Sequence, residues 1–222
     1  MKKRKDAIKI VIVDDHPIVR QGIKKVIEKE SDMIVCGEAG GTNEAISVIA
    51  REKPDIVVAD ISLYGGSSGL DLVRAIQARF SDVKSLVLSM HEESLYAERA
   101  IRAGARGYIT KNEGPANIVY ALRSVLKGDI YLSGAISTRL ISKLFHGNQP
   151  KSQHSIIETL TNRELEIFQQ IGNGFTTGEI ARQLNLSPHT IEAHRKNIKD
   201  KLGLTSGSEL NKQAIHWVLN SR

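Results

Sequence analysis

The chain has 222 residues, of which 41% are hydrophobic and one is cysteine, and its formal net charge is +6. This length fits one large domain or two small ones, and the lone Cys36 excludes an internal disulfide. No apolar stretch approaches the length of a membrane span or forms a signal-peptide core, so we expect a cytoplasmic protein without a membrane partner.

The first part of the chain alternates short apolar runs with amphipathic segments. We expect strands at 8–13, 33–35, 56–60, 86–88 and 107–111, and helices at 20–30, 44–51, 70–80, 95–103 and 118–126. Strict alternation of this kind is typical of a parallel sheet with helices on both faces. The expected fold is therefore an α/β flavodoxin-like one, with five parallel strands in the order 2-1-3-4-5.

Five polar residues lie at the carboxyl ends of the expected strands: Asp14, Asp15, Asp60, Ser89 and Lys111. Ligands of open α/β sheets bind at this edge. Three carboxylates at close range repel one another unless a cation is present, and Mg²⁺ suits carboxylates together with phosphate and water. Asp60, at the end of the central strand, can itself accept a phosphoryl group, because carboxylates form acyl phosphates. Ser89 and Lys111 would then meet the phosphoryl oxygens.

Each of these residues also has an ordinary structural explanation. An aspartate after a strand is most often a helix N-cap. A serine at such a place is commonly a turn residue, and a lysine is commonly a solvated charge. Because all five lie on one edge of the sheet, we favour the joint functional interpretation.

Four short motifs carry a resemblance to a known family: Asp14-Asp15-His16-Pro17, Val58-Ala59-Asp60, Leu88-Ser89 and Gly107-Tyr108-Ile109-Thr110-Lys111. Together they resemble the receiver domain of two-component response regulators. The resemblance implies that Asp60 is the phosphoacceptor, and that Asp15, Asp60 and the backbone carbonyl of Ser62 hold Mg²⁺, with Asp14 assisting through water. It also implies that Ser89 and Lys111 contact the phosphoryl oxygens and that Tyr108 is an inward-turning switch. The alternative for Tyr108 is a half-buried strand aromatic.

The loop after Asp60 departs from the family pattern. Family members usually have a proline four residues after the acceptor and a glycine eight residues after it. Here Tyr64 stands at the first position and Gly69 lies nine residues after Asp60, so the loop holds one extra residue. One alternative is therefore a DNA-binding regulator with a degenerate receiver that works independently of phosphorylation. A second alternative is an aspartyl-phosphate phosphatase, but that family needs an Asp-x-Asp pair, and Ile61 and Ser62 follow Asp60.

The rest of the chain is more basic. From residue 134 onward, 11 Lys and Arg oppose 7 Asp and Glu, a net charge of +4, against +2 before it. Such an excess allows nucleic acid as a partner. Residues 136–145 are a short amphipathic segment, and the polar stretch 146–155, with glycine and proline, is a linker. We expect a receiver domain at 1–133, a linker with a short helix at 134–156, and a second domain at 157–222.

Four helices are expected in the second domain. Thr161 and Glu164 form a capping box at the start of the first. The second helix (177–184), a tight turn at 185–186 and a third helix ending at Leu202 predict a helix-turn-helix, and a fourth helix covers 208–219. The third helix carries an outward polar surface of Thr190, Glu192, His194, Arg195, Lys196, Asn197 and Lys199. The alternative is a four-helix module that docks another protein.

This domain resembles the LuxR-type DNA-binding domain through Leu160-Thr161-Asn162-Arg163-Glu164, Glu179-Ile180-Ala181, the run from Leu186 to His194, and Lys201-Leu202-Gly203. Gly178 departs from the family's usual lysine. The resemblance implies that Glu192, Ala193 and Lys196 face base edges, and that phosphates are contacted by Arg195, Asn197, Thr176, Thr177 and Thr190. The whole chain thus resembles a NarL-type response regulator. We expect a sensor histidine kinase and double-stranded DNA as partners, a homodimer as the active form, and no enzymatic activity beyond the receiver's own phosphorylation and dephosphorylation.

Overall fold

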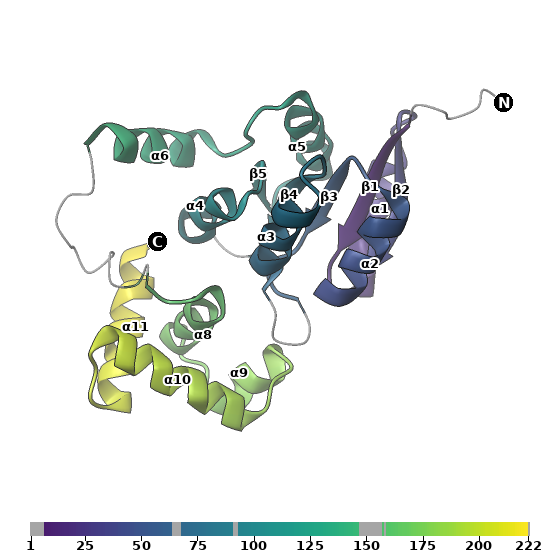
Figure 1. Cartoon of the computed structure of the whole chain (residues 1–222). Helices are drawn as coiled ribbons and strands as arrows, with labels where there is room; N and C mark the ends of the chain where they lie inside the picture. The colour runs from purple at the N-terminus through teal and green to yellow at the C-terminus, as the bar shows by residue number, and fades with distance from the viewer. Residues whose placement is uncertain (1–6, 64–67, 91–92, 147–156, 158, 222) are drawn as a thin grey trace. The chain divides into compact units, whose positions relative to one another are not determined.

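The computed structural model describes residues 7–63, 68–90, 93–146, 157 and 159–221 (Figure 1). The chain divides into two compact units, Met1–Leu140 and Ile141–Arg222, and the division falls inside helix α6 (Gly134–His146). The expected domain boundaries after residues 133 and 156 remain predictions, and most of the expected linker (147–156) lies outside the described residues. None of the helices in the described ranges is long and apolar enough to cross a membrane.

A five-stranded parallel sheet forms the centre of the first unit. Its strands, in the observed order β2-β1-β3-β4-β5, confirm the predicted fold class. They are β1 (Ile8–Val13), β2 (Met33–Ala39), β3 (Ile56–Ala59), β4 (Lys84–Ser89) and β5 (Gly107–Thr110). Val13 pairs with Ala59, and Ser89 pairs with Thr110. This register brings Asp14, Asp60 and Lys111, each the first residue after its strand, to the same edge.

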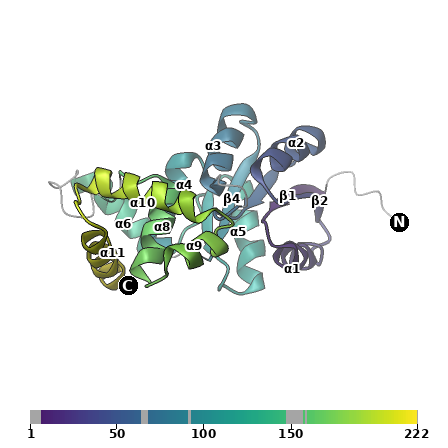
Figure 2. The same cartoon turned by 90° about the horizontal axis from the view of Figure 1, so that it is seen from below.

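Five helices cover the two faces of the sheet: α1 (Pro17–Ile27), α2 (Thr42–Glu52), α3 (Gly69–Arg79), α4 (Glu93–Ala103) and α5 (Pro115–Lys127). Strand residues alternate between two apolar cores, as the period of two in a strand requires. Ile10 and Ile12 pack into a core with α1 and α5, whereas Val11 and Val13 pack into a second core with α2 and α3. Figure 2 shows these helix pairs on opposite sides of the sheet.

Most elements of the first unit differ from the sequence-based prediction by one to four residues at one or both ends, among them α1, β2 and β4. Helix α1 spans 17–27 instead of 20–30, because Pro17 takes the first helical position, where its missing N–H is not needed. Strand β2 extends past the predicted residue 35 to Ala39. Gly37 interrupts the apolar pattern there, yet it allows close packing, since a Cβ on it would meet the Val48 side chain. Ser89 is the last residue of β4 and does not follow it.

The loop after Asp60 is closed at its neck. The Gly69 N–H donates to the Ile61 carbonyl at 2.7 Å, and Ser62 and Ser68 form an isolated antiparallel bridge. Ser68 caps α3, because its Oγ accepts from the Leu70 N–H at 3.2 Å and its own N–H donates to Asp71. The chain therefore leaves the loop and begins α3 at a fixed point beside Asp60. Tyr64, the departure noted above, lies outside the described residues.

The second unit contains α8 (Asn162–Gly172), α9 (Thr177–Gln183), α10 (Pro188–Leu202) and α11 (Gly207–Ser221). The hydroxyls of Thr161, Thr176 and Ser187 cap α8, α9 and α10. The turn between α9 and α10 places Asn185 in the left-handed region, with φ 51°. Ile180 on α9 and Ile191 and Ile198 on α10 are fully buried, so the helix-turn-helix packs on one apolar core.

Replacing Gly69 with alanine should destabilise the first unit. A Cβ at this position would overlap the carbonyl group of Asp60, so the backbone must shift, at the cost of about 1–3 kcal/mol that overpacking typically brings. Gly22→Ala is the matched control, because a Cβ there meets nothing within 4 Å. Because Gly22 is an exposed position within α1, Gly22→Ala should stabilise the folded state by about 0.5–1 kcal/mol. Urea unfolding followed by circular dichroism compares the variants, and a Gly69→Ala midpoint equal to that of the wild type would contradict the close approach.

Candidate functional site

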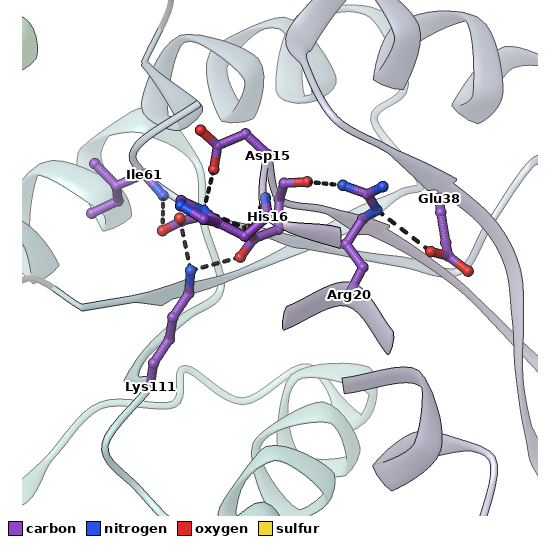
Figure 3. A network of polar contacts seen from close by, with 8 residues as sticks. Asp15, His16, Arg20, Glu38, Ile61 and Lys111 are labelled. Carbon is purple, nitrogen blue, oxygen red and sulfur yellow. Dashed lines mark hydrogen bonds and ion pairs between the residues drawn. The ribbon is translucent and has the colours of Figure 1, made fainter. Parts of the chain in front are cut away.

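Three carboxylates and one ammonium group meet at the carboxyl ends of β1, β3 and β5 (Figure 3). Lys111 Nζ lies 2.6 Å from Asp14 Oδ2 and 2.8 Å from Asp60 Oδ2. The Asp14 and Asp60 side chains are only 2% and 5% exposed. Burial alone would lower the pKa of Lys111, but attraction to Asp60 and the bonds to both carboxylates outweigh it, so the pKa is raised. Lys111 is therefore a fixed positive charge in this pocket at neutral pH.

Backbone N–H groups orient the two carboxylates that bind Lys111. The Ile61 N–H donates to Asp60 Oδ1 at 2.8 Å, and the His16 N–H donates to Asp14 Oδ1 at 2.8 Å. Neither aspartate is a helix N-cap, since His16 holds that position in α1 and Ser68 holds it in α3. The helix-cap explanation for the aspartates after β1 and β3 is therefore wrong.

Asp15 completes the acidic pocket. Its Oδ1 lies 2.6 Å from His16 Nδ1, yet this oxygen is buried and has no hydrogen bond of acceptable geometry. Ligand atoms of Asp14, Asp15 and His16 lie within 4.8 Å of one another. Asp14 and Asp60 both pair with Lys111, and the Asp15 carboxylate lies close to that of Asp14, so the pocket has more carboxylates than its lysine balances. This oxygen-rich donor set fits a hard divalent cation such as Mg²⁺.

The remaining predicted pocket residues lie on β4, on β5 and in the loop after β3. Ser89 is fully buried at the end of β4, where its carbonyl accepts from the Lys111 N–H at 2.8 Å. Tyr108 is 1% exposed, so the half-buried alternative is wrong for this residue. Ser62 lies at the neck of the loop, opposite Ser68.

Sequence reasoning missed a second layer of charged residues behind the pocket, formed by Arg20 and Glu38. Arg20 Nη1 donates to the Asp14 carbonyl at 2.6 Å, and its Nε lies 3.5 Å from Glu38 Oε2 (Figure 3). The sequence did contain an indication that Arg20 has a structural role. Arg20 precedes the buried Ile23 by three residues, so an arginine stands on the inward face of α1, where apolar residues are usual.

The predicted DNA-contacting residues lie on α10, at the start of α9 and at its cap. Four of them are exposed side chains on α10: Glu192, Ala193, Lys196 and Asn197. The Thr177 hydroxyl donates to Glu192 Oε1 at 2.7 Å and so connects α9 to α10. Thr190 and Thr176 make local capping bonds with Ser187 and Glu179. Arg195 is 16% exposed, and its Nη2 donates to Asn211 on α11 at 3.2 Å.

Helix α8 fixes the position of both helices of the helix-turn-helix. Lys201 Nζ on α10 lies 2.6 Å from Glu164 Oε2, and Arg163 Nη2 donates to the Leu184 carbonyl at the end of α9 at 3.1 Å. Burial opposes ionisation of Glu164, but its bonds with Lys201 and Thr161 outweigh burial and lower its pKa. His194, expected on the outer surface, is half-buried, and burial followed by the charge of Arg163 lowers its pKa. The prediction of a fully outward position was wrong for His194, which lies near Arg163 and Glu164 of α8, and for Arg195, which bonds to Asn211 of α11.

Comparison with known protein families gives two matches on this chain. Residues 10–123 match the response regulator receiver domain, and residues 158–214 match the luxR family of bacterial regulatory proteins. The chain is also similar to the oxygen regulatory protein NreC of Staphylococcus carnosus. The two are 36% identical over 210 residues, which are 94% of this chain and 97% of that protein.

Two solved structures are similar in fold. A LuxR-family two-component response regulator from Aurantimonas matches with 35% identity and a TM-score of 0.58, over 63% of this chain and 99% of that one. RcsB of Salmonella enterica serovar Typhimurium, bound to the rprA promoter in the presence of phosphomimetic BeF₃⁻, matches with 25% identity and a TM-score of 0.59. That alignment covers 93% of this chain and 97% of RcsB.

Proposed function

The chain belongs to the response regulators that join a receiver domain to a LuxR-type DNA-binding domain, and from this premise we propose that Asp60 is its phosphoacceptor. The protein is a DNA-binding transcription regulator controlled by phosphorylation. The observation that carries the choice of residue is the buried contact of Lys111 with Asp60 and Asp14. This contact places a cation beside two carboxylates, of which Asp60 is the one that follows the central strand β3.

Receiver domains of this family bind Mg²⁺ at their acidic site. In this chain Asp15, Asp60 and the backbone carbonyl of Ser62 would hold the ion, with Asp14 assisting through water. When bound, the ion neutralises charge on the phosphoryl oxygens. The donor set supports this assignment, because Asp15 Oδ1 is buried without a hydrogen bond.

The transfer step uses the Asp60 carboxylate as the nucleophile. An Asp60 oxygen forms a bond to the phosphorus of a phosphohistidine on the sensor kinase, while the phosphorus–nitrogen bond breaks and its electron pair stays on the imidazole. Lys111 then pairs with a phosphoryl oxygen, and the Ser89 hydroxyl donates to another. Water later hydrolyses the acyl phosphate, so the receiver catalyses only its own phosphorylation and dephosphorylation.

Phosphorylation of the pocket changes the rest of the receiver through Ser89 and Tyr108. Tyr108 is buried on β5, which pairs with β4 as far as Ser89, so movement of the serine toward the phosphoryl group changes the packing around this ring. We propose that the changed receiver surface promotes a homodimer. Such a dimer would bind two half-sites of double-stranded DNA about one helical turn or a multiple apart. Because the DNA of a bacterial cell lies in the cytoplasm, we place the active protein there.

The proposed DNA surface is the outward face of α10 together with the start of α9. Glu192, Ala193 and Lys196 would face base edges, since the first turns of a recognition helix enter the major groove. The proposed phosphate contacts come from Arg195, Asn197, Thr176, Thr177 and Thr190. Arg195 donates to Asn211 through Nη2 and would use another N–H of its guanidinium for a phosphate oxygen.

Incubation with Mg²⁺ and acetyl phosphate should add one phosphoryl group to the wild type and none to Asp60→Asn, because the amide oxygen is a poor nucleophile. Asp82→Asn, which alters an exposed aspartate outside the pocket, should retain the adduct. Intact-protein mass spectrometry measures all three. An adduct on Asp60→Asn would show that another residue is the acceptor. Absence of the adduct from all three proteins, even with cognate kinase, would favour a degenerate receiver.

Lys196→Ala should relax the preference for one base pair and weaken specific binding by about 1–3 kcal/mol, because base contacts carry sequence discrimination. Selection of bound sequences from a random duplex library, followed by fluorescence anisotropy, measures both effects. Lys212→Ala on α11 is the control and should keep the preferred sequence. An equal loss for Lys196→Ala on every sequence would instead indicate a phosphate contact.

A further inference from the structure

Arg20 lies behind the acidic pocket, near the start of α1 (Figure 3). Its Nη1 donates to the backbone carbonyl oxygen of Asp14 at 2.6 Å. The side chain is 19% exposed, and its buried Nε faces Glu38 Oε2 at 3.5 Å without completing a hydrogen bond. The Arg20 guanidinium therefore lies between the loop after β1 and the C-terminal end of strand β2.

The Asp14 backbone is held from both sides. Its N–H donates to the Ala39 carbonyl at 3.1 Å, and its carbonyl accepts from Arg20. That carbonyl belongs to the peptide group that leads into Asp15, so the bond fixes the direction in which the chain enters Asp15. Asp15 Oδ1 lies 2.6 Å from His16 Nδ1 but makes no hydrogen bond of acceptable geometry. The direction of this carboxylate therefore depends on the backbone that Arg20 holds, together with the contact to the His16 ring.

The charge of Arg20 is balanced on the side away from the pocket. Glu38 faces the Arg20 guanidinium and also pairs with Lys24 Nζ at 3.0 Å. A guanidinium presents several donors in a planar fork, so it can serve the Asp14 carbonyl and Glu38 together, whereas an ammonium is a compact point charge. The geometry thus favours an orienting role over a simple contribution of positive charge.

We propose that Arg20 is a positioning residue for the cation site, and that its bond to the Asp14 carbonyl preorganises the carboxylates of Asp14 and Asp15 for a divalent ion. This inference rests on the proposed Mg²⁺ site. Partners that orient metal ligands typically contribute about 10–100-fold to metal affinity. We expect a loss of that size when the bond is removed.

The test titrates the full-length protein with Mg²⁺ alone, in the absence of a phosphodonor. NMR follows the amide chemical shifts of pocket residues, including Ile61, as Mg²⁺ is added. The midpoint of the shift change gives the Mg²⁺ concentration at half-saturation. Arg20→Gln should raise this concentration about 10-fold or more. Lys24→Gln is the matched control, because it removes another cation bound to Glu38 from the same helix, and it should leave half-saturation unchanged.

The outcomes separate this inference from the proposed function. A wild type whose pocket amides do not respond to Mg²⁺ would overturn the metal site, and this inference with it. A wild type that responds, with the same half-saturation in Arg20→Gln, would overturn only the role of Arg20, as would an equal loss in Lys24→Gln. If Arg20→Gln does not fold, Arg20→Lys keeps the charge beside Glu38 but lacks the fork. It should also raise half-saturation, and an unchanged value would overturn the proposal.

Discussion

The ion pairs that Lys111 forms with Asp14 and Asp60 are the interaction on which the receiver site depends. They join the ends of β1, β3 and β5, which only a parallel sheet brings to one edge. A buried carboxylate is costly unless it is paired, so loss of one partner leaves an uncompensated charge. The pocket nevertheless keeps more negative charge than Lys111 balances.

Contacts outside the pocket hold the two loops that carry its carboxylates. The loop after Asp60 holds one residue more than is usual in the family, but the Ser62–Ser68 bridge and the bond from Gly69 to Ile61 close it beside Asp60. On the other side, Arg20 and Ala39 hold the backbone of Asp14. Both loops that carry carboxylates are thus anchored outside the pocket. The DNA-binding unit is also held by contacts from a neighbouring element. Arg163 and Glu164 on α8 hold the ends of α9 and α10.

Local sequence patterns were sufficient for the fold and for the main pocket residues. Apolar runs ending in Asp14 and Asp60, and helical segments between them, predicted the alternating topology, and the family motifs agreed with it. Features set by tertiary contacts were not predictable. The position of His194 near Arg163 and the bond from Arg195 to Asn211 depend on neighbours that are distant in sequence. Strand β2 was predicted too short because Gly37 breaks the apolar pattern while packing closely against Val48.

The central claim, that a phosphoryl group on Asp60 controls DNA binding, is tested most directly by the affinity of the full-length protein for its selected DNA site. The affinity is measured by fluorescence anisotropy at one salt concentration, with and without Mg²⁺ and acetyl phosphate, for the wild type and Asp60→Asn. The account predicts a rise of about 5–150-fold for the wild type, the range typical of coupling between two sites, and no change for Asp60→Asn. Equal affinities for the modified and unmodified wild type, with the adduct verified by mass, would contradict it.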